Sequence, residues 1–471
     1  MKKTYNFLTA LFAICFLLLA AAIVLQSGAA LAAAACVLLV WLVYRHPVKK
    51  FAFWLFVCSF LLQLAVLMTV HTPVISDFAE QLQAARKLRE GTMPYQISTY
   101  FRIWPYQTGF VLWEALWLSI WDDPMCLKLV HALLSSGTLC LVYRWLLERV
   151  RKPAAQAAAG LLAIFPAYFT LSLVLTNQMA GAFFIVLALW LLTCCDADRL
   201  RFWRWPLAGL SLFVSELLRP EAIVLVLVVA IWSVFSLLRT PKAWKRLVIG
   251  LLALCAVYFG CQKGTDVLFR ATGFSPWGLS NLLPEWKLVA GLNPDTGGQW
   301  NLDRYELLEA TFDENYIPTE ETHRLARELI REELKLSPRG WLSLLHKKLS
   351  NLWYYQNTYW PFLHTQDGTY TRTLLYRLVE ETERLMFYLA LALAAFGLKK
   401  QREPSELLPY FVVFALGCAF LIIEVQPRYA YLPQIFLFMA AGFGLDWLFG
   451  LLESKGGRHA TDHLSGDSLL Q

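Results

Sequence analysis

The chain has 471 residues, of which 58% are hydrophobic and only 16% are charged. A soluble domain of this length fills its core with a much smaller apolar fraction. Several nearly charge-free runs are long enough to cross about 30 Å of hydrocarbon. The composition therefore excludes an ordinary soluble protein and predicts an all-α, polytopic helical membrane protein.

Twelve membrane spans are predicted from the apolar runs. They cover residues 7–26, 29–45, 51–71, 125–147, 154–172, 177–195, 204–218, 221–238, 245–262, 383–398, 407–424 and 429–450. The first run is longer than the apolar core of a signal peptide and a second run follows it closely, so we expect it to be retained. The ten cysteines, Cys194 and Cys195 among them, lie mostly in these runs without metal-type spacing, and we interpret them as small apolar residues.

Lysine and arginine are unevenly distributed among the connections between these spans. One alternating set carries Arg45, Lys49 and Lys50; Arg144, Arg149, Arg151 and Lys152; Arg199, Arg201 and Arg204; Arg239, Lys242, Lys245 and Arg246; and Lys399, Lys400 and Arg402. The short connections of the other set carry only Arg219 and Arg428. The positive-inside rule therefore predicts that both termini are cytoplasmic and that segments 72–123 and 263–382 lie outside.

The first outer segment is too charged to span the membrane and too apolar for a plain loop. Residues 77–91 place apolar side chains at helical spacing beside basic ones, which predicts a helix lying flat at the membrane surface. Residues 109–121 are apolar enough for a short thirteenth span. If they crossed, the cations of every later connection would lie outside, so we expect a second interfacial helix.

The chain accordingly divides into six parts. They are N-terminal spans (1–71), an outer loop with interfacial helices and a candidate catalytic aspartate (72–123), a central bundle (124–262), a long, mostly helical extracytoplasmic segment (263–382), C-terminal spans (383–452) and a disordered cytoplasmic tail (453–471).

Ionisable residues at membrane depth are costly and therefore mark candidate functional positions. In this chain they gather near the outer ends of the predicted spans. They are Asp77, Glu80, Arg102, Glu114, Lys128, His131, Glu216, Arg219, Glu221, Glu424 and Arg428.

Four short motifs resemble the GT-C superfamily of membrane glycosyltransferases. They are Ser76-Asp77-Phe78 at the end of a span, Pro105-Tyr106-Gln107 before the second flat helix, Leu218-Arg219-Pro220-Glu221 at an outer turn, and Glu424-Val425-Gln426-Pro427-Arg428-Tyr429 before the last span. The likeness covers about residues 60–450. Within the superfamily the chain resembles bacterial relatives of the protein O-mannosyltransferase and aminoarabinose transferase branch, which is glycosyltransferase family 39-like. It departs from the pattern in having two additional N-terminal spans, no adjacent acidic pair after Asp77, and a single Pro105.

This resemblance implies transfer of a sugar from a polyprenyl-phosphate-linked donor to an acceptor on the extracytoplasmic face, with inversion of the anomeric centre. Asp77, with Glu80 nearby, would be the base that deprotonates the acceptor hydroxyl. Cations would bind the lipid phosphate as its charge grows. The candidates for binding the lipid phosphate and the sugar are Arg102, Lys128, His131, Arg219, Glu221, Glu424, Arg428 and Tyr429. No metal ligands are predicted, and a divalent cation is left open as a cofactor.

The two acidic candidates also have a structural interpretation. Asp77 followed by Glu80 matches a helix cap with its capping-box partner. The sequence Asp122-Asp123-Pro124 is the second acidic candidate, although it is typical of a turn that begins the next span.

The basic candidates have structural interpretations as well. Arg219 lies between two glutamates and could form only a structural ion pair. Glu424 and Arg428 are four residues apart and could pair with each other. Lys128 could extend to the lipid headgroups, and His131 could be a core residue on an apolar helix.

Two other classes of function stay open. A transporter or flippase for a lipid-linked sugar or another envelope precursor is the main alternative, although no internal repeat typical of many transporters is visible. An envelope assembly protein without chemistry is the third. The acceptor could be a glycan, a lipid or a protein, no nucleic-acid partner is expected, and the chain suits a bacterial cell membrane.

Overall fold

The computed structural model describes residues 2–26, 29–193, 203–241, 244–354, 374–399 and 402–466. All regular secondary structure within these ranges is helical, which confirms the predicted all-α class. The eight described cysteines are free. Four cations of the predicted inside pattern, Arg199, Arg201, Lys242 and Lys400, lie outside the described residues, as do Cys194 and Cys195.

Within the described ranges, helical structure lies at every predicted span. The helices are α1 (Lys2–Gln26), α2 (Ala30–Arg45), α3 (Phe51–Thr69), α8 (Pro124–Leu147), α9 (Lys152–Ile164) with α10 (Pro166–Thr170) and η2 (Leu171–Leu173), α11 (Gln178–Thr193), α12 (Arg204–Leu218), α13 (Ala222–Arg239), α14 (Trp244–Ala271), α20 (Leu374–Gly397), η7 (Pro404–Leu407) with α21 (Leu408–Ile422), and α22 (Tyr431–Gly466). Seven of the described helices are long and apolar enough to cross a membrane, and a bent pair makes eight. The multi-pass character is confirmed, whereas twelve or thirteen spans stay a prediction.

The bent pair illustrates how one residue reshapes a predicted span. Pro166 begins α10, and Phe165 before it adopts an extended conformation between the two helices. A proline cannot donate a helical hydrogen bond and disfavours helical geometry in the residue before it. The run predicted as one span at 154–172 is therefore broken, with a 54° bend.

The C-terminal helix α22 lies at the centre of the largest core. It packs against α9, α20 and α21, while α8 packs against α3 and α11, and α12 packs against α11 and α14. Gly444 allows α22 to approach α20 closely, because a Cβ atom there would lie 1.9 Å from the backbone oxygen of Leu393. Beyond this core, α22 extends to Gly466, so part of the tail predicted to be disordered is helical.

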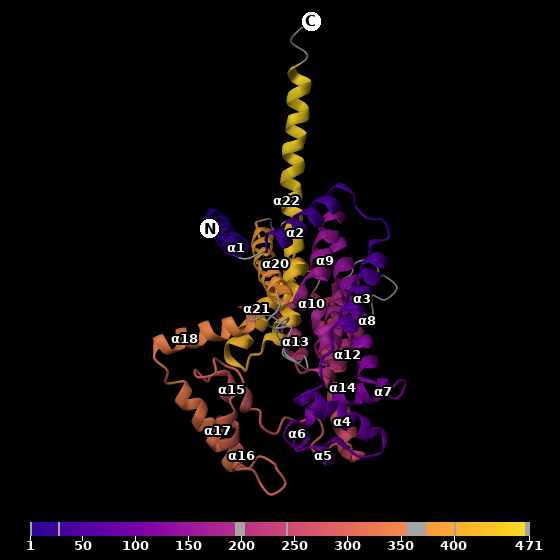
Figure 1. Cartoon of the computed structure of the whole chain (residues 1–471), viewed down its shortest axis with the longest axis vertical. Helices are drawn as coiled ribbons and strands as arrows, with labels where there is room; N and C mark the ends of the chain where they lie inside the picture. Colours follow the sequence, from indigo (N-terminus) through magenta and orange to yellow (C-terminus); the bar gives the residue numbers. More distant parts are fainter. Residues whose placement is uncertain are drawn as a thin grey trace.

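The outer segments gather at one end of the molecule. They contribute α4 (Asp77–Arg89), α5 (Pro94–Ile97), α6 (Tyr100–Ile103), η1 (Pro105–Gln107), α7 (Thr108–Leu118), α15 (Trp286–Gly291), α16 (Leu302–Glu309), α17 (Glu320–Glu333), α18 (Pro338–Leu349) and η5 (Ser350–Tyr354). Figure 1 shows α4–α7 and α15–α17 at the end opposite the C-terminus. The two segments therefore lie at the same end of the molecule, and their placement outside the membrane stays a prediction.

Helix α7 is too short to be a span. Its 11 residues are about 16 Å long at 1.5 Å per residue, about half the thickness of the hydrocarbon. It packs against α4, α8 and α12. A thirteenth span at 109–121 would need a longer helix, and the interfacial placement of α7 stays a prediction.

The close contact between α20 and α22 makes a stability prediction. Gly444→Ala should lower the free energy of unfolding by about 1–3 kcal/mol, because the added methyl group overlaps backbone that cannot rotate away. The measurement is thermal unfolding of the purified protein in detergent. Gly417→Ala on α21 is the matched control, since a Cβ atom there meets nothing within 4 Å. Equal unfolding temperatures for the two variants would contradict the close packing.

Candidate functional site

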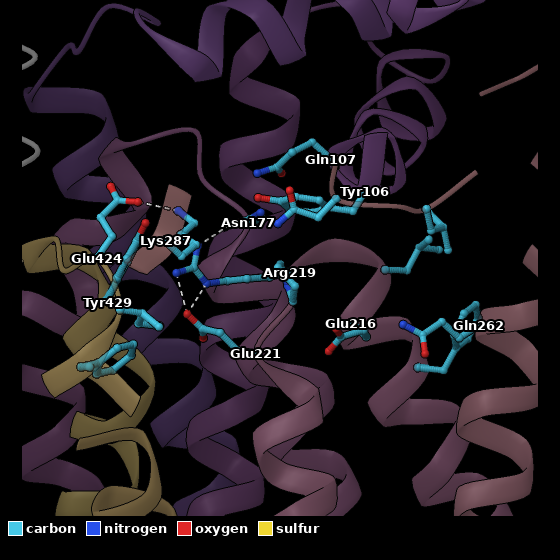
Figure 2. A pocket seen from close by; sticks show the side chains of 17 residues that line it. Tyr106, Gln107, Asn177, Glu216, Arg219, Glu221, Gln262, Lys287, Glu424 and Tyr429 are labelled. Carbon is cyan, nitrogen blue, oxygen red and sulfur yellow. Dashed lines mark hydrogen bonds and ion pairs between the residues drawn. The ribbon is translucent and has the colours of Figure 1, made fainter. Parts of the chain in front are cut away.

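Two adjoining cavities of about 380 Å³ each lie between the outer helices and the bundle, and Figure 2 shows the one that is lined by Glu216. We name them the Asp77 cavity, which also reaches Glu80 and Arg428, and the Glu216 cavity, which also reaches Glu221. They share a lining of Tyr106, Gln107, Asn177, Arg219, Lys287, Glu424 and Tyr429. Five of the six predicted acidic positions, all except Glu114, and two of the predicted cations thus line this pair of cavities.

Asp77 is held at the first position of α4 by an unusual backbone conformation. Ser76 before it has φ 58° and ψ −144° and makes no side-chain cap hydrogen bond. This left-handed φ is uncommon for a residue with a side chain and costs about 1–3 kcal/mol. The Asp77 carboxylate accepts a hydrogen bond from Arg428 at 3.3 Å. The described contacts are therefore those of an ion pair and not of a capping box.

Arg428 reaches Asp77 from the short helix η8 (Pro427–Ala430), which precedes α22. Its side chain is 8% exposed, and its guanidinium lies 4.7 Å from the centre of the Phe78 ring. Stacking on an aromatic face stabilises a guanidinium where little water reaches it. Asp77, Phe78 and Arg428 therefore connect two segments that are about 350 residues apart.

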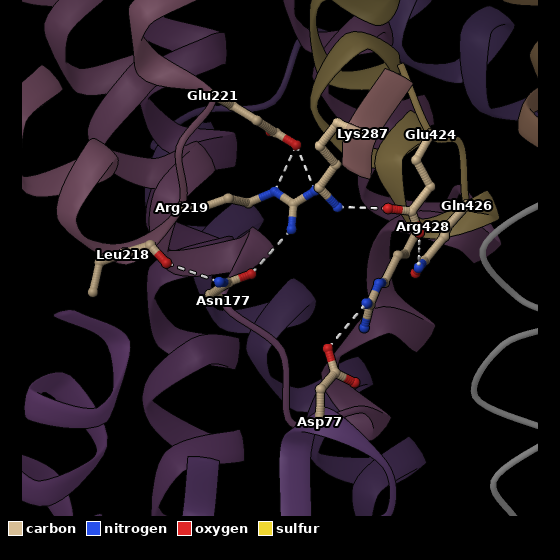
Figure 3. A network of polar contacts seen from close by, with 9 residues as sticks. All are labelled: Asp77, Asn177, Leu218, Arg219, Glu221, Lys287, Glu424, Gln426 and Arg428. Atoms are coloured by element: carbon tan, nitrogen blue, oxygen red, sulfur yellow. Dashed lines mark hydrogen bonds and ion pairs between the residues drawn. The ribbon is translucent and has the colours of Figure 1, made fainter. Parts of the chain in front are cut away.

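Glu424 pairs with a residue that the sequence analysis did not identify. Lys287 of α15 lies 2.5 Å from Oε2 of Glu424, and Gln426 donates to Oε1 at 2.9 Å (Figure 3). The Glu424 backbone also donates to the Lys287 oxygen at 2.8 Å. The salt-bridge partner of Glu424 is therefore Lys287, and Arg428 four residues later contacts Asp77 instead.

The pair of Lys287 and Glu424 is held in its ionised form. Burial alone raises the pKa of Glu424, but the charge of Lys287 opposes it and the net pKa is lowered. Burial alone lowers the pKa of Lys287. The nearby Tyr429, Glu424 and Tyr106 side chains raise it more strongly, so the net pKa is raised. Both charges are therefore present at neutral pH.

Arg219 is anchored at the turn between α12 and α13. Its guanidinium pairs with Glu221 at 2.5 Å, donates to Asn177 at 3.2 Å and lies 4.8 Å from the centre of the Tyr429 ring. Asn177 in turn donates to the Leu218 oxygen at 2.8 Å (Figure 3). The predicted pairing of Arg219 with a flanking glutamate is present, and the same guanidinium lines both cavities.

Three predicted binding residues lie elsewhere. Arg102 donates to the backbone oxygens of Tyr95 and Asn315, each at 3.0 Å. Lys128 donates to the Thr72 hydroxyl at 3.0 Å. His131 is buried and accepts a hydrogen bond from the Trp113 indole at 3.3 Å. None of the three lines either cavity.

The second acidic candidate has structural contacts. Asp123 caps α8 by accepting a hydrogen bond from the Met125 backbone at 2.7 Å. Asp122 pairs with Arg86 and Arg89 of α4, at 3.0 and 2.7 Å. These contacts support the interpretation of the sequence as a turn that begins a span.

Sequence reasoning missed Lys287 and Asn177. A signal for Asn177 existed, because the polar run Thr176-Asn177-Gln178 interrupts apolar sequence where a span was predicted to begin. Lys287 lies in the long outer segment without any motif around it. Among the residues that the structure describes, no three His, Cys, Asp or Glu side chains form a group that could hold a metal ion.

The charge state of the pair of Lys287 and Glu424 leads to a prediction about how stability depends on pH. A lowered carboxylate pKa contributes stability above the ordinary value of 4.5, which is lost as the pH falls through the folded-state pKa. A raised lysine pKa contributes stability below the ordinary value of 10.5, which is lost as the pH rises through the folded-state pKa. Glu424→Gln should therefore destabilise the protein between about pH 5 and 10 and weaken its acid-dependent loss of stability.

Glu424→Gln should lower the free energy of unfolding by about 1–3 kcal/mol. This loss is smaller than that for a fully buried pair, because the Lys287 side chain is 35% exposed. Thermal unfolding across this pH range measures it. Glu321→Gln is the control, since Glu321 forms an exposed pair with Arg324. An acid transition that is the same in Glu424→Gln as in the unaltered protein would contradict the ionised pair.

Comparison with known proteins places this site in a family context. Residues 115–259 match the dolichyl-phosphate-mannose-protein mannosyltransferase family. This stretch runs from α7 into α14 and contains Asn177, Arg219 and Glu221. No curated protein matches the chain.

Solved structures show a related fold. The Archaeoglobus fulgidus oligosaccharyltransferase tethered with an acceptor peptide containing the NVT sequon is similar with a TM-score of 0.51 and 15% identity, over 86% of this chain and 51% of that one. The AglB oligosaccharyltransferase from the same organism, in complex with an inhibitory peptide and a dolichol-phosphate, gives a TM-score of 0.49 and 14% identity over 88% and 52%. The present chain thus spans about half the length of these proteins. The family match confirms, over residues 115–259, the resemblance predicted from the sequence, and the helix composition is that of a multi-pass membrane protein.

Proposed function

We propose that this protein transfers a sugar from a polyprenyl-phosphate-linked donor to a hydroxyl acceptor on the extracytoplasmic face, with inversion of the anomeric carbon. The observation that supports this proposal is the Asp77 cavity, where one carboxylate pairs with a cation and two further cations, Arg219 and Lys287, line the same wall. A base and a group of cations are what the reaction needs. The alternative of a transporter or flippase lacks such support, because the matched family consists of glycosyltransferases.

In the proposed reaction Asp77 is the base. The acceptor oxygen forms a bond to the anomeric carbon while its proton moves to the Asp77 carboxylate. The bond between that carbon and the phosphate oxygen breaks on the opposite side, and the polyprenyl phosphate leaves with the bonding electrons. Arg219, Lys287 and Arg428 stabilise the charge that grows on the phosphate. Glu80 lines the same cavity and is proposed to assist in holding the acceptor.

The ion pair of Asp77 with Arg428 bears on when the base becomes active. The Asp77 oxygen that accepts the hydrogen bond from Arg428 is partly covered by the guanidinium and is less accessible to the acceptor hydroxyl. A donor phosphate that enters the cavity would compete for Arg428 and loosen its 3.3 Å contact with Asp77. We therefore propose that donor binding activates the base, which limits proton abstraction to the loaded site.

An apolar groove supports a lipid-linked donor. It has a volume of about 650 Å³ and is lined mainly by apolar side chains of α20, α21 and η5, among them Trp353, Phe387 and Val413. Phe420 lines both this groove and the Glu216 cavity. An isoprenoid chain in the groove would therefore place its phosphate near the shared cations. The acceptor is proposed to enter the Asp77 cavity, whose aromatic walls include Trp104 and Trp300.

Replacement of the proposed base tests the reaction. Asp77→Asn should lower the rate of transfer about 10²- to 10⁴-fold, because the amide cannot accept the proton. The measurement is release of polyprenyl phosphate from a panel of polyprenyl-phosphate sugars, polyprenyl-phosphate mannose among them, by protein purified in detergent. Asp122→Asn is the matched control, since this exposed aspartate of the same outer segment pairs only with α4. Transfer by folded Asp77→Asn at the unaltered rate would remove Asp77 as the base.

Replacement of Arg219 tests the phosphate site. Arg219→Gln should lower kcat about 10²- to 10³-fold, the loss typical when one donor to a developing negative charge is removed. It should also weaken binding of polyprenyl phosphate added to the micelles. Arg86→Gln is the control, because Arg86 is exposed and pairs with Asp122 outside both cavities. If Arg219→Gln keeps both kcat and phosphate binding, Arg219 has only a structural role.

A further inference from the structure

Lys348 is a buried lysine in the last turn of α18, within the long outer segment. It is only 1% exposed, which is rare for a lysine unless its charge is paired. Among the described residues, no carboxylate forms a salt bridge with its Nζ atom, and two backbone oxygens accept its hydrogen bonds instead. These two acceptors lie beside the candidate site.

The two acceptors belong to the ends of two different helices. Nζ of Lys348 donates to the Gly291 oxygen at 2.7 Å and to the Ile423 oxygen at 2.7 Å. Gly291 is the last residue of α15, and Ile423 is the C-cap of α21. Carbonyls at helix C-termini lack partners within the helix, and a cation there is favoured by the helix dipole. The Lys348 ammonium therefore donates hydrogen bonds to the C-terminal ends of two helices at once.

Each of these helix ends lies next to one member of the ion pair between Lys287 and Glu424. Glu424 follows Ile423 directly, and Lys287 lies one helical turn before Gly291. A Cβ atom on Gly291 would lie 2.3 Å from the Ile422 oxygen, so α15 and the end of α21 are already in backbone contact. The Lys348 ammonium therefore links α15 to the end of α21, the two segments that bring Lys287 and Glu424 within 2.5 Å of each other.

The loop after α15 wraps around the same lysine. Gly298 has φ 81°, and a Cβ atom there would lie 2.9 Å from Cγ and Cε of Lys348. The Gly298 oxygen accepts a hydrogen bond from the Val425 backbone at 2.8 Å. The lysine stem therefore fills the space inside a turn that also fixes the residue following Glu424.

We propose that Lys348 is a positioning residue for glycosyl transfer, whose buried ammonium joins the C-terminal ends of α15 and α21 and thereby sets the placement of Lys287 and Glu424. It is not proposed as a catalytic residue, since it lines neither the Asp77 cavity nor the Glu216 cavity, although its side chain also lines the apolar groove proposed for the isoprenoid chain. This inference rests on the proposed function, because the placement matters only if Lys287 binds the donor phosphate.

The electrostatics support this role. Burial lowers the pKa of Lys348 to about 8, although the charge of Glu424 opposes the shift. The lysine therefore keeps its proton at neutral pH in a place that disfavours charge. An apolar side chain of the same length would be easier to bury, but it would leave both helix-end oxygens without a donor.

The test removes the ammonium and keeps the length of the side chain. Lys348→Met should lower kcat for release of polyprenyl phosphate about 10- to 100-fold, the loss expected when a binding group is misplaced by about 1 Å. Lys347→Met is the matched control, because Lys347 is the neighbouring residue, is exposed and donates to the Pro294 oxygen at 2.8 Å. This control should transfer at the unaltered rate.

A double-mutant cycle separates positioning from general stability. If Lys348 acts through Glu424, Lys348→Met should cause little further loss of kcat in the Glu424→Gln background. If the two substitutions instead damage the structure independently, the fold-losses of kcat for Lys348→Met and Glu424→Gln should multiply in the double variant. Multiplied losses, or a kcat for Lys348→Met equal to that of Lys347→Met, would overturn the inference.

Two additions keep the result interpretable. If Lys348→Met is not recovered folded, Lys348→Gln is used in the same cycle, and it must show the same dependence on Glu424 for the inference to stand. Asp77→Asn is assayed in parallel. An inactive Asp77→Asn with a fully active Lys348→Met rejects only the role of Lys348, whereas an active Asp77→Asn rejects the proposed base.

Discussion

Two ion pairs with buried members join segments of this protein that are far apart in the sequence. Asp77 reaches Arg428 across about 350 residues, and Lys287 reaches Glu424 across 137. A single unpaired charge at these positions would be costly, because little water reaches the Arg428 and Glu424 side chains. The first outer loop, the long outer segment and the turn before α22 are therefore held around one pair of cavities. The strained Ser76 backbone and the close approach at Gly291 are local features of that arrangement.

Much of the fold is predictable from the sequence because lipid imposes a simple rule on it. Apolar runs of sufficient length coincide with helices, and the proline that begins α10 and the glycines at contact points refine that pattern locally. The number of spans is harder to predict, since α2, α11 and α12 have only 16, 16 and 15 residues. Whether such a short helix crosses the membrane depends on its tilt and its neighbours, which composition does not record.

The candidate site is predictable where its residues lie at the ends of spans. Asp77, Arg219, Glu424 and Arg428 stand out because charge is rare beside apolar runs. Their partners do not stand out in the same way. The spacing of Glu424 and Arg428 suggests that they pair with each other, but η8 turns Arg428 toward Asp77 and leaves Glu424 facing Lys287. Lys287 and Lys348 lie among many charged residues of the outer segment, where only tertiary contacts distinguish a buried lysine from an exposed one.

The pairing also has a consequence for the proposed chemistry. Three cations face the cavities, and each is matched by an acid, namely Asp77, Glu221 or Glu424. When Asp77 accepts the acceptor proton it becomes neutral, and Arg428 loses its anionic partner at the moment that negative charge grows on the departing phosphate. In the proposed reaction the bound donor phosphate already competes for Arg428, and the guanidinium can pair fully with the phosphate once Asp77 is neutral. Interactions that strengthen only as the reaction proceeds lower its barrier, whereas those that are equally strong throughout do not. An ion pair that exchanges its anion as the proton moves would meet that condition, and under the proposed function the contact between Asp77 and Arg428 would serve the reaction as well as link two loops.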